Sequence, residues 1–112
     1  MVKTIRSKEC CHLSSLQKPI YDRIKGELKT LLRHGELIHY KAGQVIFYEG
    51  HLPCGFFFLK TGIVNAAHEE CLLGLAHLIA NTPYCTTCAA KSNVDVVFVG
   101  KSAVSKFLTE VL

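Results

Sequence analysis

The stretch from residue 41 to residue 64 decides the fold. It reads Lys41-Ala42-Gly43-Gln44-Val45-Ile46-Phe47-Tyr48-Glu49-Gly50 and, after a short loop, Gly55-Phe56-Phe57-Phe58-Leu59-Lys60-Thr61-Gly62-Ile63-Val64. Short runs of β-branched and aromatic residues alternate here with glycines, and runs of this length between turn residues are typical of strands. The run from residue 44 to 49 is apolar on both faces, which fits the interior of a sandwich or barrel. The stretch therefore predicts an antiparallel, mainly β domain.

Helices are predicted on both sides of this β region. Apolar residues recur at helical spacing from Pro19 to Arg33, and Gly35 is available for a left-handed cap after that helix. Ser102 is expected to cap a final helix. Further strands are predicted at 37–40, 56–60, 86–90 and 94–99, with another starting at Ile63. Residues 69–80 are ambiguous, because a helical apolar face there contains a glycine.

Length and composition limit the kind of protein. The chain has 112 residues, of which 49% are hydrophobic and 20% charged, and its formal net charge is +4. This length suits one domain, so we expect an N-terminal arm at 1–18 and a single domain at 19–112. Residues 1–15 lack the apolar core of a signal peptide, and no apolar run approaches the ~20 residues of a membrane span. We therefore expect a cytoplasmic protein with free thiols and no membrane contact.

The 41–64 stretch resembles the opening of a cyclic-nucleotide-binding domain, and most of all that of the Crp/Fnr bacterial regulators. Their pattern is a polar residue, Gly, an apolar run and Glu-Gly, followed by Gly, an apolar strand and Ser/Thr-Gly-x-Val. The resemblance spans about residues 19–112 and is weakest at 69–90. It implies a double-stranded β-helix (a jelly roll or β-roll) with short flanking helices. It also implies a sensory domain that binds a small-molecule effector.

The effector site implied by the family departs from its usual pattern here. Family members use a Gly-Glu-apolar turn that opens a short helix, followed by an Arg-Ser/Thr pair. The helix N–H groups and the arginine neutralise the cyclic phosphate, and the glutamate holds the ribose. The matching positions here are Gly74, Leu75 and Ala76, then Tyr84, Cys85 and Thr86. Both charged groups are missing, and residues 71–90 contain no Asp, Glu, Lys or Arg at all. Cyclic AMP is therefore not expected to bind in the usual mode, and the effector is unknown. The helix N–H groups at Gly74 to Ala76 could still hold another anionic small molecule.

The chain is also short between the Gly-x-Val strand and this turn. Family members place a β-hairpin there, whereas only Asn65 to Leu73 separate the two features in this sequence. The resemblance therefore implies a β-roll with one hairpin shortened.

Cysteines and histidines leave other cofactors open. Cys85 and Cys88 have metal-ligand spacing, and Cys10 and Cys11 could complete a four-thiolate zinc or iron–sulfur site of a redox sensor. The alternative is that these cysteines are buried small apolar residues. Histidines at 68 and 77 near the expected pocket allow haem as well.

Neither a nucleophile elbow nor a Walker loop nor a dinucleotide fingerprint is present, so we expect no enzyme. In the family, a dimerisation helix and a DNA-binding helix-turn-helix follow the roll, and neither is found before Leu112. Contact with DNA is therefore expected only through a C-terminal domain absent from this chain, and a homodimer is compatible with that arrangement. The alternative is a stand-alone module that acts through protein contacts.

Overall fold

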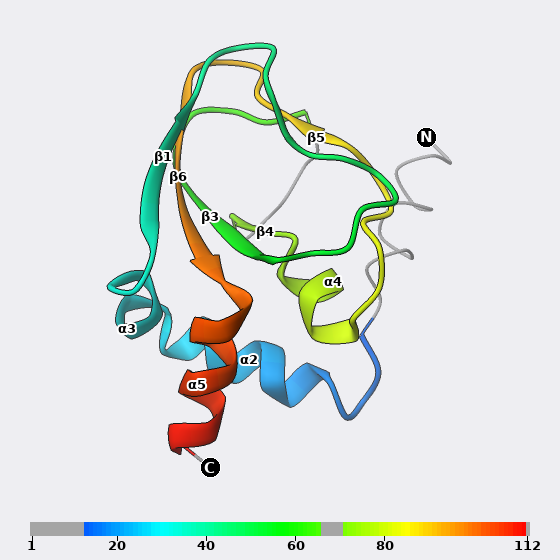
Figure 1. Ribbon diagram of the computed structural model, residues 1–112, viewed down its shortest axis with the longest axis vertical. Coiled ribbons are helices and arrows are strands. Elements are labelled where there is room, and N and C mark those ends of the chain that lie inside the picture. Colours follow the sequence, from blue (N-terminus) through cyan, green and yellow to red (C-terminus); the bar gives the residue numbers. More distant parts are fainter. Residues whose placement is uncertain (1–12, 66–70, 112) are drawn as a thin grey trace.

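The computed structural model describes residues 13–65 and 71–111, so the predictions for Cys10, Cys11 and His68 lie outside the described residues. Short strands are enclosed by helices, in the order α2 (Lys18–Gly26), α3 (Leu28–Leu32), β1 (Glu36–Tyr40), β2 (Val45–Phe47), β3 (Gly55–Thr61), β4 (Leu72–Leu73), α4 (Leu75–Ala80), β5 (Cys88–Ala89), β6 (Val94–Gly100) and α5 (Lys101–Val111). Figure 1 shows the helices gathered at one end of the strands.

The strands form two antiparallel sheets. The larger has the order β1-β6-β3-β4, and the smaller pairs β2 with β5. In Figure 1 the larger sheet lies on one side of the roll and the β2–β5 pair lies on the other. A bridge between Val64 and Ala90 adds a further link between the two halves of the chain. This arrangement confirms the predicted β-roll with short flanking helices.

Two hydrophobic cores lie on opposite faces of the larger sheet. Successive strand residues point to opposite faces, so Phe57 and Val96 face the interior of the roll whereas Phe56 and Val99 face the helices. Helix residues such as Ile24 and Leu31 complete the second core. One sheet therefore supplies a wall of the roll and, through its other face, the docking surface for α3, α4 and α5.

Two of the helix predictions were wrong in detail. The single helix expected from Pro19 to Arg33 is split, because Glu27 leaves helical geometry (φ −115°, ψ 28°) between α2 and α3. Gly35 does not adopt a left-handed cap. A Cβ atom at this position would lie 2.4 Å from Cγ1 of Val97, so the glycine instead permits close packing against β6.

The remaining differences concern element ends. Ser102 lies inside α5 rather than capping it, since the helix begins at Lys101 directly after β6. The strand expected at Ile63 is reduced to the bridge at Val64. The ambiguous segment contains both kinds of structure, namely the two-residue strand β4 followed by α4. The predicted strands at 44–49 and 86–90 are shorter, at Val45–Phe47 and Cys88–Ala89.

Candidate functional site

The predicted effector turn is present, and its glycine is required by geometry. Gly74 precedes α4 with a left-handed backbone (φ 81°), and Leu75 after it is fully buried. A Cβ atom on Gly74 would lie 2.9 Å from Cε1 of Tyr84. Glycine is therefore needed both for the backbone conformation and for the close approach of the tyrosine ring.

Tyr84 occupies the position at which the family resemblance implies an arginine. Its side chain is only 6% exposed, and its ring stacks on Phe47 with 3.9 Å between the ring centroids. The backbone is held by two hydrogen bonds to the loop after β2: Tyr84 N–H donates to the His51 carbonyl (3.0 Å), and Gly50 N–H donates to the Tyr84 carbonyl (2.9 Å). The structure thus brings Gly74 and Tyr84 together, and their binding of an effector stays a prediction.

Burial changes the acid–base behaviour of this tyrosine. Desolvation raises the pKa of Tyr84 to about 12, with a smaller contribution from the neighbouring Cys54 and Cys88. The side chain is therefore a neutral hydroxyl at physiological pH, and it cannot supply the positive charge that an arginine would give a phosphate.

The other predicted effector residues lie close by in sequence, but their role stays a prediction. Ala76 is half-buried in the first turn of α4, and Cys85 and Thr86 are half-buried on the segment that follows Tyr84. His77 is buried, with its ring 5.8 Å from that of Tyr84. The segment before β5 therefore packs as part of the wall of the roll.

The predicted thiolate site is only partly covered by the described residues. Cys85 is half-buried, whereas Cys88 is fully buried in the core of the roll. Burial raises the pKa of the Cys88 thiol to about 12, which opposes the thiolate form that a metal needs. Among residues 13–65 and 71–111, no group of three or more His, Cys, Asp or Glu side chains could hold a metal ion.

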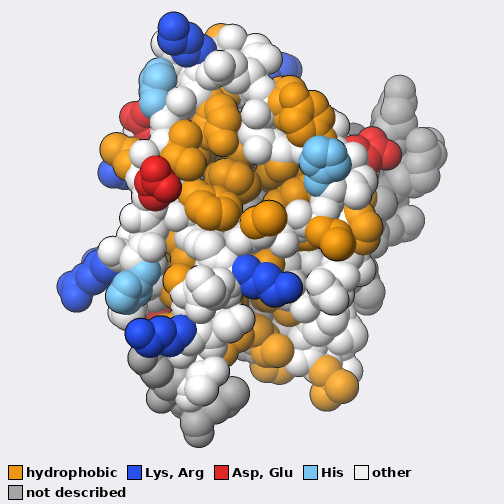
Figure 2. Space-filling view, viewed as in Figure 1, with side chains coloured by type: hydrophobic (Ala, Val, Ile, Leu, Met, Phe, Trp, Pro, Cys, Tyr) orange, Lys and Arg blue, Asp and Glu red, His pale blue; other side chains and the backbone are white. Residues whose placement is uncertain are grey.

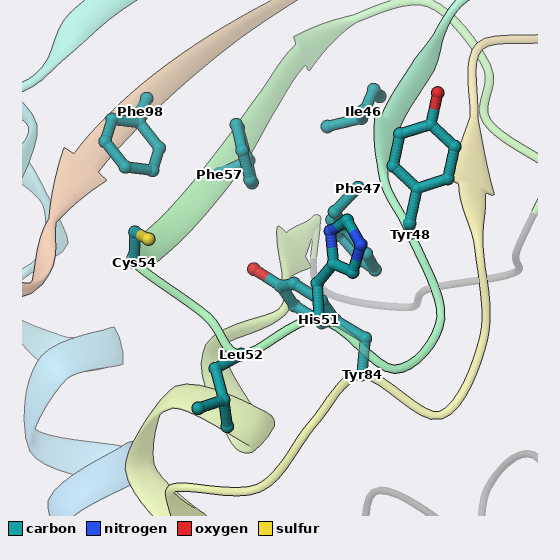
Figure 3. A pocket seen from close by; sticks show the side chains of 9 residues that line it. All are labelled: Ile46, Phe47, Tyr48, His51, Leu52, Cys54, Phe57, Tyr84 and Phe98. Carbon is teal, nitrogen blue, oxygen red and sulfur yellow. The ribbon is translucent and has the colours of Figure 1, made fainter.

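A cavity of about 200 Å³ opens beside Tyr84, and we call it the ring-lined hollow (Figure 3). Its walls come from β2, the loop after it, β3, β6 and the segment before β5, with nine side chains: Ile46, Phe47, Tyr48, His51, Leu52, Cys54, Phe57, Tyr84 and Phe98. Six of the nine carry rings, and none is Asp, Glu, Lys or Arg. The side chains that line the hollow are therefore mainly aromatic, and they carry no formal charge when His51 is neutral.

The shape of the hollow depends on a glycine and on an aromatic pair across two strands. A Cβ atom on Gly55 would lie 2.7 Å from Cζ of Phe98, so the glycine allows the Phe98 ring to lie over the start of β3. The rings of Phe57 and Phe98 stand 4.9 Å apart at a tilt of 49°. Exposed Tyr48 and Leu52 extend this surface outward, and Figure 2 shows hydrophobic side chains gathered on the same face.

Sequence reasoning missed the ring-lined hollow. It assigned no site role to Phe47, Phe57 or Phe98, nor to the loop residues His51 and Cys54. The period of two along β3 and β6 does indicate that Phe57 and Phe98 can share a face. The loop residues carry no such local signal, because only the folded chain brings them to the same place.

Comparison with known proteins identifies the family. A family model described as "Cyclic nucleotide-binding domain" matches residues 37–110. This chain belongs to that family. The cyclic nucleotide-binding domain family consists of regulatory ligand-binding domains, and the match includes both Gly74 and Tyr84. The resemblance seen in the sequence is thereby confirmed.

Solved structures of Crp/Fnr-type regulators share the fold of this cyclic nucleotide-binding domain. Catabolite activator protein from Thermus thermophilus is 15% identical, with a TM-score of 0.64 over 77% of this chain and 47% of that chain. A transcriptional regulator from Thermotoga maritima is 14% identical, with a TM-score of 0.62 over 74% and 76%. The sensor domain of the transcriptional regulator DNR from Pseudomonas aeruginosa is 20% identical, with a TM-score of 0.60 over 87% and 66%.

At these identities the likeness concerns the fold alone. No curated protein matches the chain by sequence. Within the described residues, none of the helices is long and apolar enough to cross a membrane.

Proposed function

We propose that this cyclic nucleotide-binding domain is the sensory, ligand-binding part of a Crp/Fnr-type transcription regulator and does not bind cyclic AMP in the usual mode. In this proposal residues 19–112 form the sensory domain, residues 1–18 form an arm, and the domain acts in the cytoplasm without catalysing a reaction. It contacts DNA only through a separate domain, and pairing of two copies would couple the ligand to that domain.

The observation that carries this proposal is the place of Tyr84. Its neutral ring lies against Gly74 and stacks on Phe47, where a cyclic phosphate would require a cation. No charged residue occurs between 71 and 90 to replace that cation. Burying a phosphate without a paired charge is strongly unfavourable. The same observation favours an uncharged effector over the anionic effector predicted from the sequence.

Calorimetric titration of the full chain with cyclic AMP and cyclic GMP tests this proposal. We expect no saturable heat from either nucleotide, whereas a cyclic nucleotide-binding domain with an intact arginine, used as control, should give a normal binding curve. Tight binding of either nucleotide at one molecule per chain would overturn the proposal.

The sequence also predicts an alternative function, in which the domain is a redox sensor that holds zinc, an iron–sulfur cluster or haem. The neutral, buried thiol of Cys88 argues against its use as a ligand. Metal analysis and an absorption spectrum of protein purified without oxygen test this alternative. A colourless, metal-free protein would contradict the redox sensor, and stoichiometric metal bound through Cys85 and Cys88 would support it.

A further inference from the structure

Among residues 13–65 and 71–111, no group forms a hydrogen bond with the hydroxyl of the buried side chain of Tyr84. The side chain is 6% exposed. Buried polar groups in proteins are almost always hydrogen-bonded, so such an exception requires an explanation. The hydroxyl is also neutral, since the pKa of Tyr84 is raised to about 12. It can therefore donate one hydrogen bond that no described residue accepts.

This hydroxyl belongs to the wall of the ring-lined hollow. Figure 3 shows the hydroxyl end of Tyr84 directed to the side of the hollow where Cys54 lies, with Phe57 and Phe98 on the wall beyond. Since His51 and Cys54 are exposed at the rim, a small molecule can approach from solvent. This donor and the aromatic walls thus face the same space.

The size and chemistry of the hollow restrict what can fill it. Its volume of about 200 Å³ lies below the roughly 300–1,000 Å³ of pockets for drug-sized ligands. A single aromatic ring with a short substituent fits a hollow of about 200 Å³ better than a nucleotide does. Aromatic walls favour offset-stacked or edge-to-face ring contacts. No lining side chain is Asp, Glu, Lys or Arg, so His51 at the rim is the one lining side chain that could pair with an anionic ligand.

We infer that the ring-lined hollow binds a small, uncharged aromatic molecule carrying a hydrogen-bond acceptor, and that the Tyr84 hydroxyl donates to that acceptor. This inference rests on the proposed sensory function and names the chemical class of its effector. Phe57 and Phe98 supply the apolar contact area, and the hydrogen bond from Tyr84 fixes the orientation of the acceptor.

Three probe molecules of similar shape separate the contributions of ring, acceptor and charge. Acetophenone has a ring and a carbonyl acceptor, ethylbenzene has the ring alone, and benzoate has the ring and a negative charge. In ¹H–¹⁵N NMR titrations of the full chain, acetophenone should give saturable shifts at residues that line the hollow. Ethylbenzene should bind about tenfold more weakly, because it forms no hydrogen bond. Benzoate should bind most weakly, because its carboxylate would be desolvated without a charged partner when His51 is neutral.

Matched variants then test the residues. Tyr84→Phe should weaken acetophenone binding about tenfold and leave ethylbenzene binding unchanged, since only the hydroxyl is removed. Tyr40→Phe is the control, because Tyr40 also packs against the core of the roll but does not line the hollow. Phe98→Leu should weaken both probes, whereas Phe58→Leu, on the face that packs against the helices, should weaken neither.

The inference is overturned if acetophenone gives no saturable shift, if Tyr84→Phe binds it as tightly as the original chain, or if the shifts map only to a second groove, which is lined by Ile20 of α2, Ile79 of α4 and Val104 of α5. These outcomes are separate from the failure of the proposed function. Binding of cyclic AMP in the calorimetric titration would overturn the proposed function whatever acetophenone does. Absence of binding by both cyclic AMP and acetophenone would overturn only the inference.

Discussion

The two faces of the larger sheet differ although neighbouring residues of the same strands build them. On the helix face, Phe56 and Val99 are fully buried beneath α3, α4 and α5. On the roll face, Phe98 is only half-buried, and no described residue forms a hydrogen bond with the hydroxyl of Tyr84 opposite. The helix face is thus filled for stability, whereas the roll face retains a hollow. One side of the sheet thus supports the stability of the fold, and the other side leaves space for the ligand that we propose.

The greatest change in stability is expected when one phenylalanine from each face is replaced by alanine and the two variants are compared. Phe56→Ala should lower the free energy of unfolding by about 3–5 kcal/mol, because it leaves a cavity in a fully closed core. Phe98→Ala should lower it by roughly half as much or less, since the ring already borders an open hollow. Urea unfolding of both variants measures the difference. Equal losses, or a greater loss at Phe98, would contradict the division between the two faces.

The second effect concerns alkaline pH and the roll face alone. Burial raises the pKa of Cys88 from 9.0 to about 12 and that of Tyr84 from 10.0 to about 12. The unfolded chain therefore loses these protons at lower pH than the folded chain does. The contribution of the two protonated side chains to the free energy of unfolding is fully present below pH 9 and is lost as pH rises towards 12. Unfolding curves should show this decline, on the order of a few kcal/mol.

The variant Cys88→Ala should remove the part of the decline that begins at pH 9, where the unfolded thiol starts to ionise. An unchanged pH profile in this variant would show that the Cys88 thiol is not desolvated in the folded chain.

A smaller effect tests the hydroxyl of Tyr84. Tyr84→Phe should change the free energy of unfolding by less than about 1 kcal/mol, because no described residue forms a hydrogen bond with the hydroxyl and the hydroxyl borders an open hollow. Tyr40→Phe serves as the control. A loss of more than about 1 kcal/mol in Tyr84→Phe would mean that the hydroxyl has a partner in the folded protein.

The smallest effect lies on the opposite face, where Asp95 accepts a hydrogen bond from His39 Nδ1 at 2.8 Å. This hydrogen bond is the main cause that lowers the pKa of Asp95. The contribution of this hydrogen bond to the free energy of unfolding is present above the ordinary pKa of an aspartate. It is lost as pH falls through the lowered pKa of Asp95. Because both side chains are exposed, His39→Ala should change the acid limb of the stability profile only slightly. A large change there would contradict the assignment of pH sensitivity to the roll face.

Much of the fold could be predicted because its signals are local. Glycine-punctuated apolar runs located β1, β3 and β6 nearly to the residue. The break at Glu27 was missed, because the apolar period continues across it. The role of Gly35 depends on Val97 in a distant strand. The ring-lined hollow combines segments far apart in the sequence, and no local pattern indicates that they meet.

The most direct test of the central claim is calorimetry of one preparation with two compounds, cyclic AMP and acetophenone. Because Tyr84 lies at the position of the family's arginine, the domain should bind an uncharged aromatic molecule and not a cyclic phosphate. We therefore expect saturable heat with acetophenone, reduced in Tyr84→Phe, and no saturable heat with cyclic AMP. Saturable heat with cyclic AMP and none with acetophenone would contradict this claim.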